Sequence, residues 1–574
     1  MINKQLMNLL NSYLKLNEEK KIHDKDEANL VNQKKIIISN SLNALSFVMN
    51  DIHGLKKNNY YWSMILNSWV EWFVAIYLNR IKFIQFLKET NNYENIKKNI
   101  LIKNVLIPFD WNEFMLKTNN INWNIQILSQ IINHENFNEL DKIKFEYLNK
   151  PKIYNRKETI KSKIKKYILN LLIIRKNFFL LTYPFRTSIY DALKLYFKSM
   201  GKIYPQLNTL TSEISTNQIY KVQINIDKRK KILKKLLGSK LINKDLCLLL
   251  SLNLPISYIE NFPIFYQKVL NSRLYIHKPK KIFTSSSHHE DICAQILLAE
   301  LKLFGSRIIT MQHGGANYGT IKLDHNNGNS SDYLYKDHFL TWGWKINTHD
   351  KPFPSFRLYQ SYKLFKKNKH TIENNNFNVL FICGANKKWE FRRNFHYKDN
   401  FLKKNLNLRR KFFNSLSVDL KSKITLRPYN FHYKAYDGLE DIEFIKLNYA
   451  NINISKVKNI YDLVLNYNLL IFDSLSTFNI EIMTINKPFL LFFDLETYNM
   501  STIGRELFKK LKINEIYHSD EKSLLSTLIK INEVGINIWW SKKNRKKIID
   551  DYKKQFGLFD KNILNSFINL TNKL

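Results

Sequence analysis

Short runs of β-branched and aromatic residues alternate along this chain with helix-length amphipathic segments, which limits the folds open to it. In the first half the strand-like runs are KKIIIS (34–39), FFLLTY (178–183), KIFTSS (281–286), RIITMQ (307–312) and HFLTWG (338–343). In the second half they are NVLFICG (378–384), KITLRP (423–428), IEFIKL (442–447), NLLIFD (468–473) and PFLLFF (488–493). Continuous apolar strands separated by helices are typical of parallel sheets covered on both faces. The pattern predicts an α/β fold with doubly wound parallel sheets.

A polar, lysine-rich stretch around 363–377 interrupts this alternation once. We therefore expect two Rossmann-like domains, an N-terminal one over 1–370 and a C-terminal one over 371–574. Helical insertions are expected in the N-terminal domain at about 40–170 and 186–280. A chain of 574 residues is long enough for two such domains.

The strongly basic composition does not by itself select a partner. The 90 Lys and Arg residues against 49 Asp and Glu give a formal charge of +41. The excess is spread along the chain together with abundant Asn and Ile, which is the codon bias of an AT-rich genome. We therefore expect no nucleic-acid partner, although a basic surface suits anionic nucleotides, acidic glycans or an anionic membrane face.

Cysteine usage and hydropathy bear on the cellular location. The three cysteines are far apart, at Cys247, Cys293 and Cys383, and predict neither disulfides nor a structural zinc site. The N-terminus lacks the apolar core of a signal peptide, and two basic residues interrupt the most apolar stretch, 167–185. These features predict a cytoplasmic protein, with peripheral contact at the cytoplasmic face of the membrane left open.

Glycine and histidine gather in one region of the chain. Five of the 14 glycines lie within residues 311–343, and six of the 14 histidines lie within 288–349. In open α/β sheets ligands bind beyond the carboxyl ends of the strands, where these residues are expected. The clustering predicts a functional site there.

The QHGG turn at 312–315 follows the strand-like run RIITMQ. Glycine permits positive φ and close approach of the backbone to a ligand, and histidine titrates near neutrality. We predict that His313 is the catalytic general base. The predicted substrate loop around it consists of Gln312, Gly314, Gly315 and Tyr318. A tight turn with a hydrogen-bonded histidine is the alternative.

The segment SSSHHED (285–291) ends another predicted strand and opens a helix. Asp291 and Glu290 are the alternative bases to His313, and His288 is a candidate substrate contact. Neighbouring side chains on a helix diverge by about 100°, so the His pair is poor chelating geometry and no metal is expected. Plain helix capping by the serines is the alternative.

The segment DSLSTFNIE (473–481) follows the run NLLIFD. The hydroxyls of Ser474, Ser476 and Thr477 at a helix start suit either capping or a donor diphosphate. Glu481, one turn further, is placed to accept hydrogen bonds from ribose hydroxyls. An ordinary cap with an acid favoured by the helix dipole is the alternative.

Basic side chains follow two further strands. Lys387 lies in GANKKWEFRR (384–393), for which a solvated loop is the alternative. Arg427 ends a strand-like run, and arginine suits bidentate contacts to anions. The basic segment 227–240 is expected to be a surface helix whose apolar face packs on the core, the alternative being a membrane-bound helix.

Several common catalytic motifs are absent from the sequence. There is no Walker A, G-x-G-x-x-G, HExxH or G-x-S-x-G pattern. This argues against P-loop NTPases, ordinary dehydrogenases, zincins and α/β-hydrolases.

Together, four segments carry a family resemblance. They are YYWSMILNSWVEWFVAIYLNRI (60–81), MQHGGANYG (311–319), TLRPY (425–429) and LLIFDSLSTFNIEIMTINKPFLLFF (469–493). With them the chain resembles a family of bacterial transferases of surface-carbohydrate biosynthesis, related to capsule transferases and CDP-glycerol glycerophosphotransferases. The resemblance implies a GT-B-like architecture, two Rossmann-like domains facing a cleft for a nucleotide-diphosphate sugar, with no essential metal or cofactor. It also implies that His313 faces this cleft from the first domain. On the second domain, Arg427 would approach the donor phosphates, and Ser476, Thr477 and Glu481 would hold the nucleotide.

The expected function is therefore glycosyl transfer. We expect a metal-independent transferase that moves a sugar from a nucleotide-activated donor to a surface polysaccharide or glycan precursor by general-base catalysis. Its expected partners are a nucleotide sugar and a glycan or lipid-linked acceptor. A CDP-polyol phosphotransferase of the same fold is one alternative, and a nonenzymatic basic protein that binds nucleic acid or membrane is another.

Overall fold

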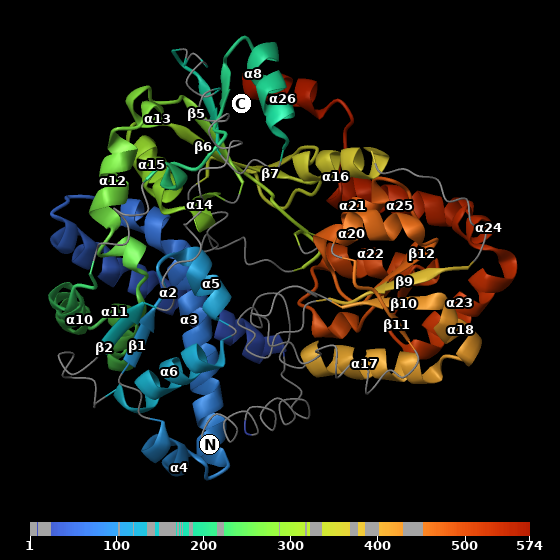
Figure 1. Ribbon diagram of the computed structural model, residues 1–574, viewed down its shortest axis with the longest axis horizontal. Helices are drawn as coiled ribbons and strands as arrows, with labels where there is room; N and C mark the ends of the chain where they lie inside the picture. Colours follow the sequence, from blue (N-terminus) through green and yellow to red (C-terminus); the bar gives the residue numbers. More distant parts are fainter. Residues whose placement is uncertain are drawn as a thin grey trace. The chain divides into compact units, whose positions relative to one another are not determined.

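The computed structural model describes most of the chain and contains two six-stranded sheets and one two-stranded sheet (Figure 1). The described residues are 9, 24–100, 104–118, 120–134, 144–147, 168, 172, 174, 176–182, 187–214, 223–285, 287–315, 318–321, 336–367, 377–384, 401–428, 452–457 and 459–573.

The chain divides into two compact units. The first contains Lys21–Met311 and Asp324–Phe339, and the second contains Gln312–Leu323 and Leu340–Leu574. The domain boundary expected near residue 370 stays a prediction. By this division the QHGG turn belongs to the second unit, together with the C-terminal part of the chain.

The first sheet has the strand order β4-β3-β5-β6-β7-β8. Its strands are β3 (Phe179–Leu181), β4 (Ile203–Pro205), β5 (Lys281–Thr284), β6 (Arg307–Met311), β7 (His338–Thr341) and β8 (Asp350–Pro352). The pairs β3–β4, β3–β5 and β5–β6 are parallel. The chain passes from β3 outward to β4 and then back to β5, so the strand order reverses between β3 and β5.

The helices of the first unit precede and surround this sheet. They are α2 (Asp24–His53), α3 (Asn59–Glu89), α4 (Tyr93–Asn99), α5 (Trp111–Lys117), α6 (Ile121–Ile132), α8 (Ile189–Lys198), α10 (Ile226–Ser239), α11 (Lys244–Asn253), α12 (Phe262–Leu270), α13 (Arg273–Ile276), α14 (Ser287–Glu290) and α15 (Ile292–Leu303). A small parallel pair, β1 (Asn104–Ile107) with β2 (Lys144–Tyr147), lies among them.

The strand predicted at 34–39 is wrong, because this run lies inside the 30-residue helix α2. Ile38, Leu42, Leu45 and Met49 are all buried, at the three- and four-residue spacing of one helix face. The apolar periodicity of the longer segment therefore overrides the strand preference of three consecutive isoleucines.

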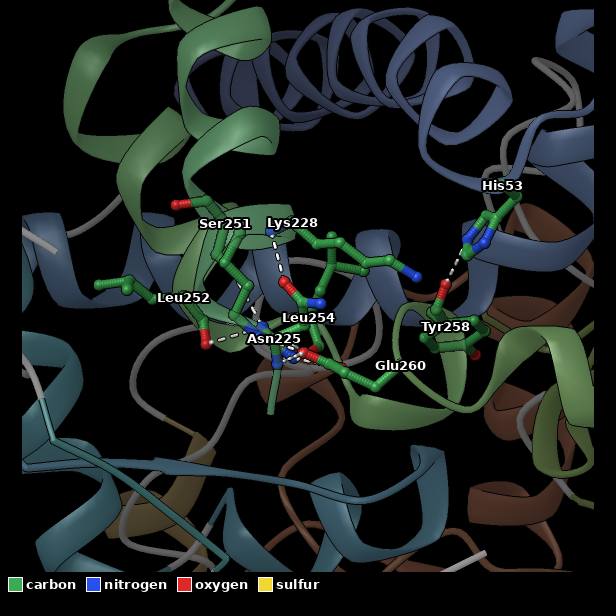
Figure 2. A network of polar contacts seen from close by, with 9 residues as sticks. His53, Asn225, Lys228, Ser251, Leu252, Leu254, Tyr258 and Glu260 are labelled. Atoms are coloured by element: carbon green, nitrogen blue, oxygen red, sulfur yellow. Dashed lines mark hydrogen bonds and ion pairs between the residues drawn. The ribbon is translucent and has the colours of Figure 1, made fainter. Parts of the chain in front are cut away.

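Helix α10 packs its apolar face inward, as the core-packing interpretation of 227–240 predicted. Ile232 and Leu236 are fully buried, and Arg229 is buried beside them. The Arg229 guanidinium pairs with Glu260 at 2.9 Å and donates to the Leu254 carbonyl oxygen at 3.1 Å. Figure 2 shows Glu260 and Leu254 within this polar network. This network fixes α10 to the turn that follows α11.

The second sheet has the strand order β11-β10-β9-β12-β13-β14, and all five neighbouring pairs are parallel. Its strands are β9 (Val379–Ile382), β10 (Ile424–Arg427), β11 (Asn453–Ile454), β12 (Leu469–Phe472), β13 (Phe489–Phe492) and β14 (Tyr517–His518). This is the 3-2-1-4-5-6 order of a doubly wound nucleotide-binding sheet, with β9 as its first strand. The predicted α/β class with two Rossmann-like sheets is confirmed.

The helices of the second unit surround this sheet (Figure 1). They are α16 (Phe356–Lys367), α17 (Phe401–Ser415), α18 (Val418–Lys423), α20 (Ile460–Leu463), α21 (Thr477–Met483), α22 (Thr502–Ile513), α23 (Glu521–Val534), α24 (Ile536–Trp540), α25 (Lys543–Phe556) and α26 (Ile563–Lys573). The strand predicted at 442–447 lies outside the described residues. Among the helices that are described, none combines the length and apolar character of a membrane span.

Candidate active site at the switch point of the second sheet

The strand order of the second sheet reverses between β9 and β12, and ligands of doubly wound folds bind beyond the carboxyl ends of such a strand pair. Gly384 follows β9 here, and Asp473 and Ser474 follow β12. The Gly384 amide donates to the Asp473 carboxylate. A methyl group on Gly384 would overlap the Ser474 side chain, so only glycine allows the two strand ends to come this close.

The Asp473 carboxylate also forms a buried ion pair with Arg409 of α17. Both side chains are almost fully inaccessible to solvent. Neither Asp473 nor Arg409 is among the residues predicted for the site. A signal existed for Arg409, because it lies three and four positions before Phe412 and Phe413 on the buried face of α17. A cation at an apolar position of an amphipathic helix indicates a buried partner.

Two further groups flank the turn after β9. The Cys383 thiol is buried, which raises its pKa to about 12 and keeps it protonated at neutral pH. Arg427 ends the adjacent strand β10, and its carbonyl oxygen accepts the Cys383 amide at 3.0 Å. Burial lowers the pKa of the Arg427 guanidinium from its usual range, but arginine remains cationic at neutral pH. The predicted donor ligand Lys387 lies outside the described residues.

Helix α21 begins beside this turn with a complete capping box. The Ser476 amide donates to Asn479 Oδ1 at 2.8 Å, and the Ser476 hydroxyl bonds to the same oxygen. Asn479 Nδ2 in turn donates to the Ser474 carbonyl oxygen at 3.2 Å. The capping alternative for Ser476 is therefore realised, and its predicted contact with the donor stays a prediction.

The Thr477 hydroxyl links α21 to the QHGG turn. Its Oγ1 accepts the Gly315 amide at 2.8 Å. A Cβ on Gly314 would lie 3.1 Å from the same oxygen, and Gly315 has a φ of 37°. The positive φ favours glycine at position 315, and a Cβ at position 314 would push the Thr477 hydroxyl back by a few tenths of an ångström. Two motifs more than 150 residues apart in the sequence, each predicted as part of the site, are in direct contact within the second unit.

Gln312 holds the base of this turn and is itself buried. Its Oε1 accepts from the Trp342 amide at 2.9 Å and from Trp344 Nε1 at 2.9 Å. Its Nε2 donates to the Gly314 carbonyl oxygen at 2.9 Å. The amide of Gln312 thus contacts the protein rather than open solvent, which makes it a support of the loop.

His313 lies between these supports and is half-buried. Its ring meets the ring of Tyr318 edge-on, with centroids 5.9 Å apart and an interplanar angle of 79°. The chain is anchored again after Tyr318, where the carbonyl oxygen of Gly319 accepts from Ser501 Oγ at 2.8 Å. The backbone is therefore held both before His313, through Gln312, and after Tyr318, through Ser501.

Glu481 is fully buried on α21, and both of its carboxylate oxygens are engaged. Arg357 Nε donates to Oε1 at 2.6 Å, and the Tyr461 hydroxyl donates to Oε2 at 2.7 Å. Burial and the nearby carboxylate raise the pKa of Tyr461 to about 12, so it remains a donor at neutral pH. Contact with a ribose would require Glu481 to exchange one of these partners, neither of which the sequence indicated.

The alternative bases belong to the first unit, whereas His313 belongs to the second. Asp291 is the N-cap of α15, where its Oδ1 accepts from the Ala294 amide at 3.1 Å and from Thr211 Oγ1 at 2.7 Å. Burial raises the pKa of Asp291. The carbonyl oxygen of Glu290 accepts from Asn112 Nδ2 at 3.0 Å.

The histidine pair preceding Asp291 lies in the short helix α14. His289 Nδ1 lies 3.1 Å from Ser68 Oγ, which ties this helix to α3. The backbone of His288 is helical. Within the described part of the chain, no three His, Cys, Asp or Glu side chains are grouped suitably for a metal ion.

Comparison with known proteins places the chain in a family. Among solved structures, MurG of Acinetobacter baumannii is 9% identical with a TM-score of 0.31, the similarity covering 70% of this chain and all of that one. The spinosyn rhamnosyltransferase SpnG is 10% identical with a TM-score of 0.27, covering 69% of this chain and all of that one. These are distant similarities, and the fold assignment rests on the strand orders given above. No curated protein matches the chain.

The model of the LIC12162 family transferases, in contrast, matches residues 8–570. The chain therefore belongs to the LIC12162 family of transferases.

Proposed function

We propose that this transferase is a glycosyltransferase that moves a sugar from a nucleotide-activated donor to a surface polysaccharide or glycan precursor. The observation that carries the proposal is the hydrogen bond between Gly315 and Thr477. It joins the histidine-bearing turn to the helix that follows β12, at the switch point of a doubly wound sheet. This contact supports the proposal that the donor nucleotide binds at this switch point and that His313 is the general base beside it.

The donor would lie with its diphosphate at the turns after β9 and β12. Gly384 gives the backbone close access at the first βα turn, where dinucleotide-binding sheets also use glycine. Arg427 supplies a fixed positive charge at the end of the neighbouring strand, and Lys387 is proposed as a second cation. Ser474, Ser476, Thr477 and Glu481 remain proposed donor ligands, and the last three would have to share or exchange their present partners.

In the proposed reaction His313 acts as the general base. Its neutral imidazole takes the proton of an acceptor hydroxyl while the hydroxyl oxygen attacks the anomeric carbon. The bond from that carbon to the diphosphate breaks as the new glycosidic bond forms, and the diphosphate leaves with the bonding electrons. Arginine and lysine stabilise the developing charge, so the proposed reaction needs no metal ion. Asp291 and Glu290 are the alternative bases.

The acceptor is proposed to be a glycan or lipid-linked precursor. A chain with a net charge of +41 suits an acidic glycan or the anionic cytoplasmic face of a membrane. The proposed location is therefore the cytoplasm, with peripheral contact at that face.

A nucleotide panel tests the donor assignment. We expect one of CMP, CDP, UDP, GDP or dTDP to raise the melting temperature, since a ligand at 100 times its Kd stabilises by about 2.7 kcal/mol. Arg427→Ala should abolish the shift. His313→Ala should keep the shift and lose at least about 100-fold in transfer.

The controls separate the competing explanations. Stabilisation by none of the nucleotides would overturn the donor assignment. Full transfer by His313→Ala would refute its role as the base. If CDP stabilises, the product decides between the two reactions, because glycosyl transfer leaves a glycosidic bond and polyol-phosphate transfer leaves a phosphodiester.

A further inference from the structure

The amino-terminal edge of the first sheet carries a surface that the proposed reaction does not use. Parallel strands begin at the same edge, so the turns before β3, β4, β5 and β6 lie side by side. The backbone confirms this, because the Phe179 amide donates to the Lys202 carbonyl oxygen at 2.7 Å. The Lys280 amide donates to the Phe178 carbonyl oxygen at 3.0 Å, and the Arg307 amide donates to that of Lys280 at 3.1 Å. We call these turns and the helix ends that lead into them the amino edge.

Large apolar side chains are exposed at the amino edge. They are Phe197 (67% exposed), Met200 (66%), Ile276 (61%), Leu303 (45%) and Phe304 (49%). Single exposed apolar residues are normal on protein surfaces, but several in adjoining turns indicate an interaction surface. They come from the ends of α8, α13 and α15, which surround the first sheet in Figure 1.

Cations are interspersed among these apolar side chains. The exposed ones are Lys176, Lys198, Lys202, Lys278, Lys280 and Arg307. Lys278 Nζ lies 3.9 Å from the centre of the Phe304 ring, so charged and apolar groups share one surface. In the described residues of these turns and the one before β7, Asp337 is the only acid, and it is paired with Lys302 at 2.7 Å. The amino edge is therefore both apolar and strongly positive.

We propose that the amino edge docks this protein on an anionic phospholipid bilayer. Aromatic and aliphatic side chains enter the region between headgroups and acyl chains, while lysine and arginine contact the lipid phosphates. Each cation near an anionic surface contributes about 1 kcal/mol. A single-stranded nucleic acid would also attract the cations, but it needs aromatic faces for base stacking, and three of the five exposed apolar residues are aliphatic. The bilayer is therefore the better fit.

This inference deepens the peripheral location proposed above and rests on it for its biological setting. Vesicle binding, however, is measured without donor or acceptor. Loss of the proposed transferase chemistry and loss of bilayer binding are therefore separate results.

The choice of variants follows from the backbone. Met200 and Lys278 have φ values of 51° and 44°, so substitutions there would disturb strained turns. Phe197→Ser with Phe304→Ser removes two apolar contacts, and Lys198→Glu with Lys202→Glu reverses two charges. The matched controls are Phe47→Ser on α2, whose side chain is 76% exposed, and Lys546→Glu with Lys547→Glu on α25.

The experiment is cosedimentation of the full chain with vesicles of phosphatidylglycerol and phosphatidylcholine, or of phosphatidylcholine alone, at about 0.1 M salt. We expect binding to the anionic vesicles only. Each amino-edge variant should weaken it about tenfold or more, while the controls bind as the unaltered chain does and all variants keep its melting temperature. Absence of binding to anionic vesicles, or equal loss in the controls, would overturn the proposal. One further result would overturn the proposal: oligouridylate releases the protein from the vesicles, and the variant with Phe197→Ser and Phe304→Ser still binds them fully. That combination would indicate a nucleic-acid surface.

Discussion

At the residue scale, the closest fit in the candidate site is between Gly384 and Ser474. The two residues follow neighbouring strands, and the Gly384 amide is held by Asp473. Any side chain at position 384 must displace Ser474 and with it the turn after β12. The glycine therefore sets the spacing of the two turns at which the donor diphosphate is proposed to bind.

Gly384→Ala is expected to lower the free energy of unfolding by about 1–3 kcal/mol through overpacking. It should also weaken nucleotide binding, because the two turns separate. Adding Ser474→Gly removes the overlapping atoms and should restore most of the stability, so the two changes are not additive in the free energy of unfolding. Nucleotide binding should stay weak in the double variant, because the Ser474 hydroxyl is a proposed donor ligand. Urea unfolding and nucleotide thermal shifts measure these effects.

The matched control is Gly238→Ala in α10, where an added Cβ meets nothing within 4 Å. This change should leave stability equal or raise it by about 0.5–1 kcal/mol, since alanine is the better helix former. A Gly384→Ala variant as stable as the Gly238→Ala variant would contradict the proposed packing.

At the element scale, the hydrogen bond from Gly315 to Thr477 holds the QHGG turn against α21. Thr477→Val keeps the shape of the side chain but removes the acceptor, which leaves the Gly315 amide unsatisfied. We expect a loss of about 1–3 kcal/mol in stability and a lower kcat, because the turn that bears His313 is no longer fixed. Thr477→Ser should restore both.

The same pair of variants separates two roles for Thr477. If the hydroxyl only supports the turn, Thr477→Val binds the nucleotide as tightly as the unaltered chain does. If the hydroxyl is also a donor ligand, nucleotide affinity falls together with kcat. Unchanged stability and unchanged kcat would contradict both roles.

Elements with long apolar runs were predictable from the sequence, and very short ones were not. Every residue of β9, β12 and β13 is both buried and apolar. In β5 and β6 a basic first residue is followed by buried residues that are apolar or threonine. β11 and β14 have only two residues each, too few for any periodicity to appear.

The candidate site was likewise predictable where its residues follow recognisable strands, and not where it depends on contacts between distant elements. Sequence position placed Gly315 and Thr477 at strand ends, where the structure brings them together. It did not indicate that Arg357 and Tyr461 would take both oxygens of Glu481, because they come from other helices, 124 and 20 residues away. Contacts between elements distant in sequence leave no local pattern.

At the scale of the whole molecule, each compact unit contains a histidine that is uncharged at neutral pH, half-buried in the first unit and buried in the second. In the first unit, His53 Nε2 donates to the Tyr258 carbonyl oxygen at 3.0 Å, as Figure 2 shows, and its ring stacks on Phe262. In the second unit, His518 is 3% exposed, and its ring nitrogens lie 3.2 Å from Ser523 Oγ and from the Glu515 carbonyl oxygen. Burial lowers the pKa of each to about 4 from the usual 6.5.

These two histidines predict acid sensitivity of both units between pH 6.5 and 4. Above pH 6.5 both are neutral in the folded and unfolded chain, so they do not change the free energy of unfolding. Below it the unfolded chain takes up protons that the folded chain does not, and the free energy of unfolding falls until the pH reaches the folded-state pKa. Between pH 7 and 5 the loss should be about 2 kcal/mol per histidine. Urea unfolding across this range should show His53→Gln and His518→Gln each removing about half of this part of the pH dependence. The exposed His277→Gln should leave it unchanged, and a pH dependence equally steep in all three variants would rule out both histidines as its source.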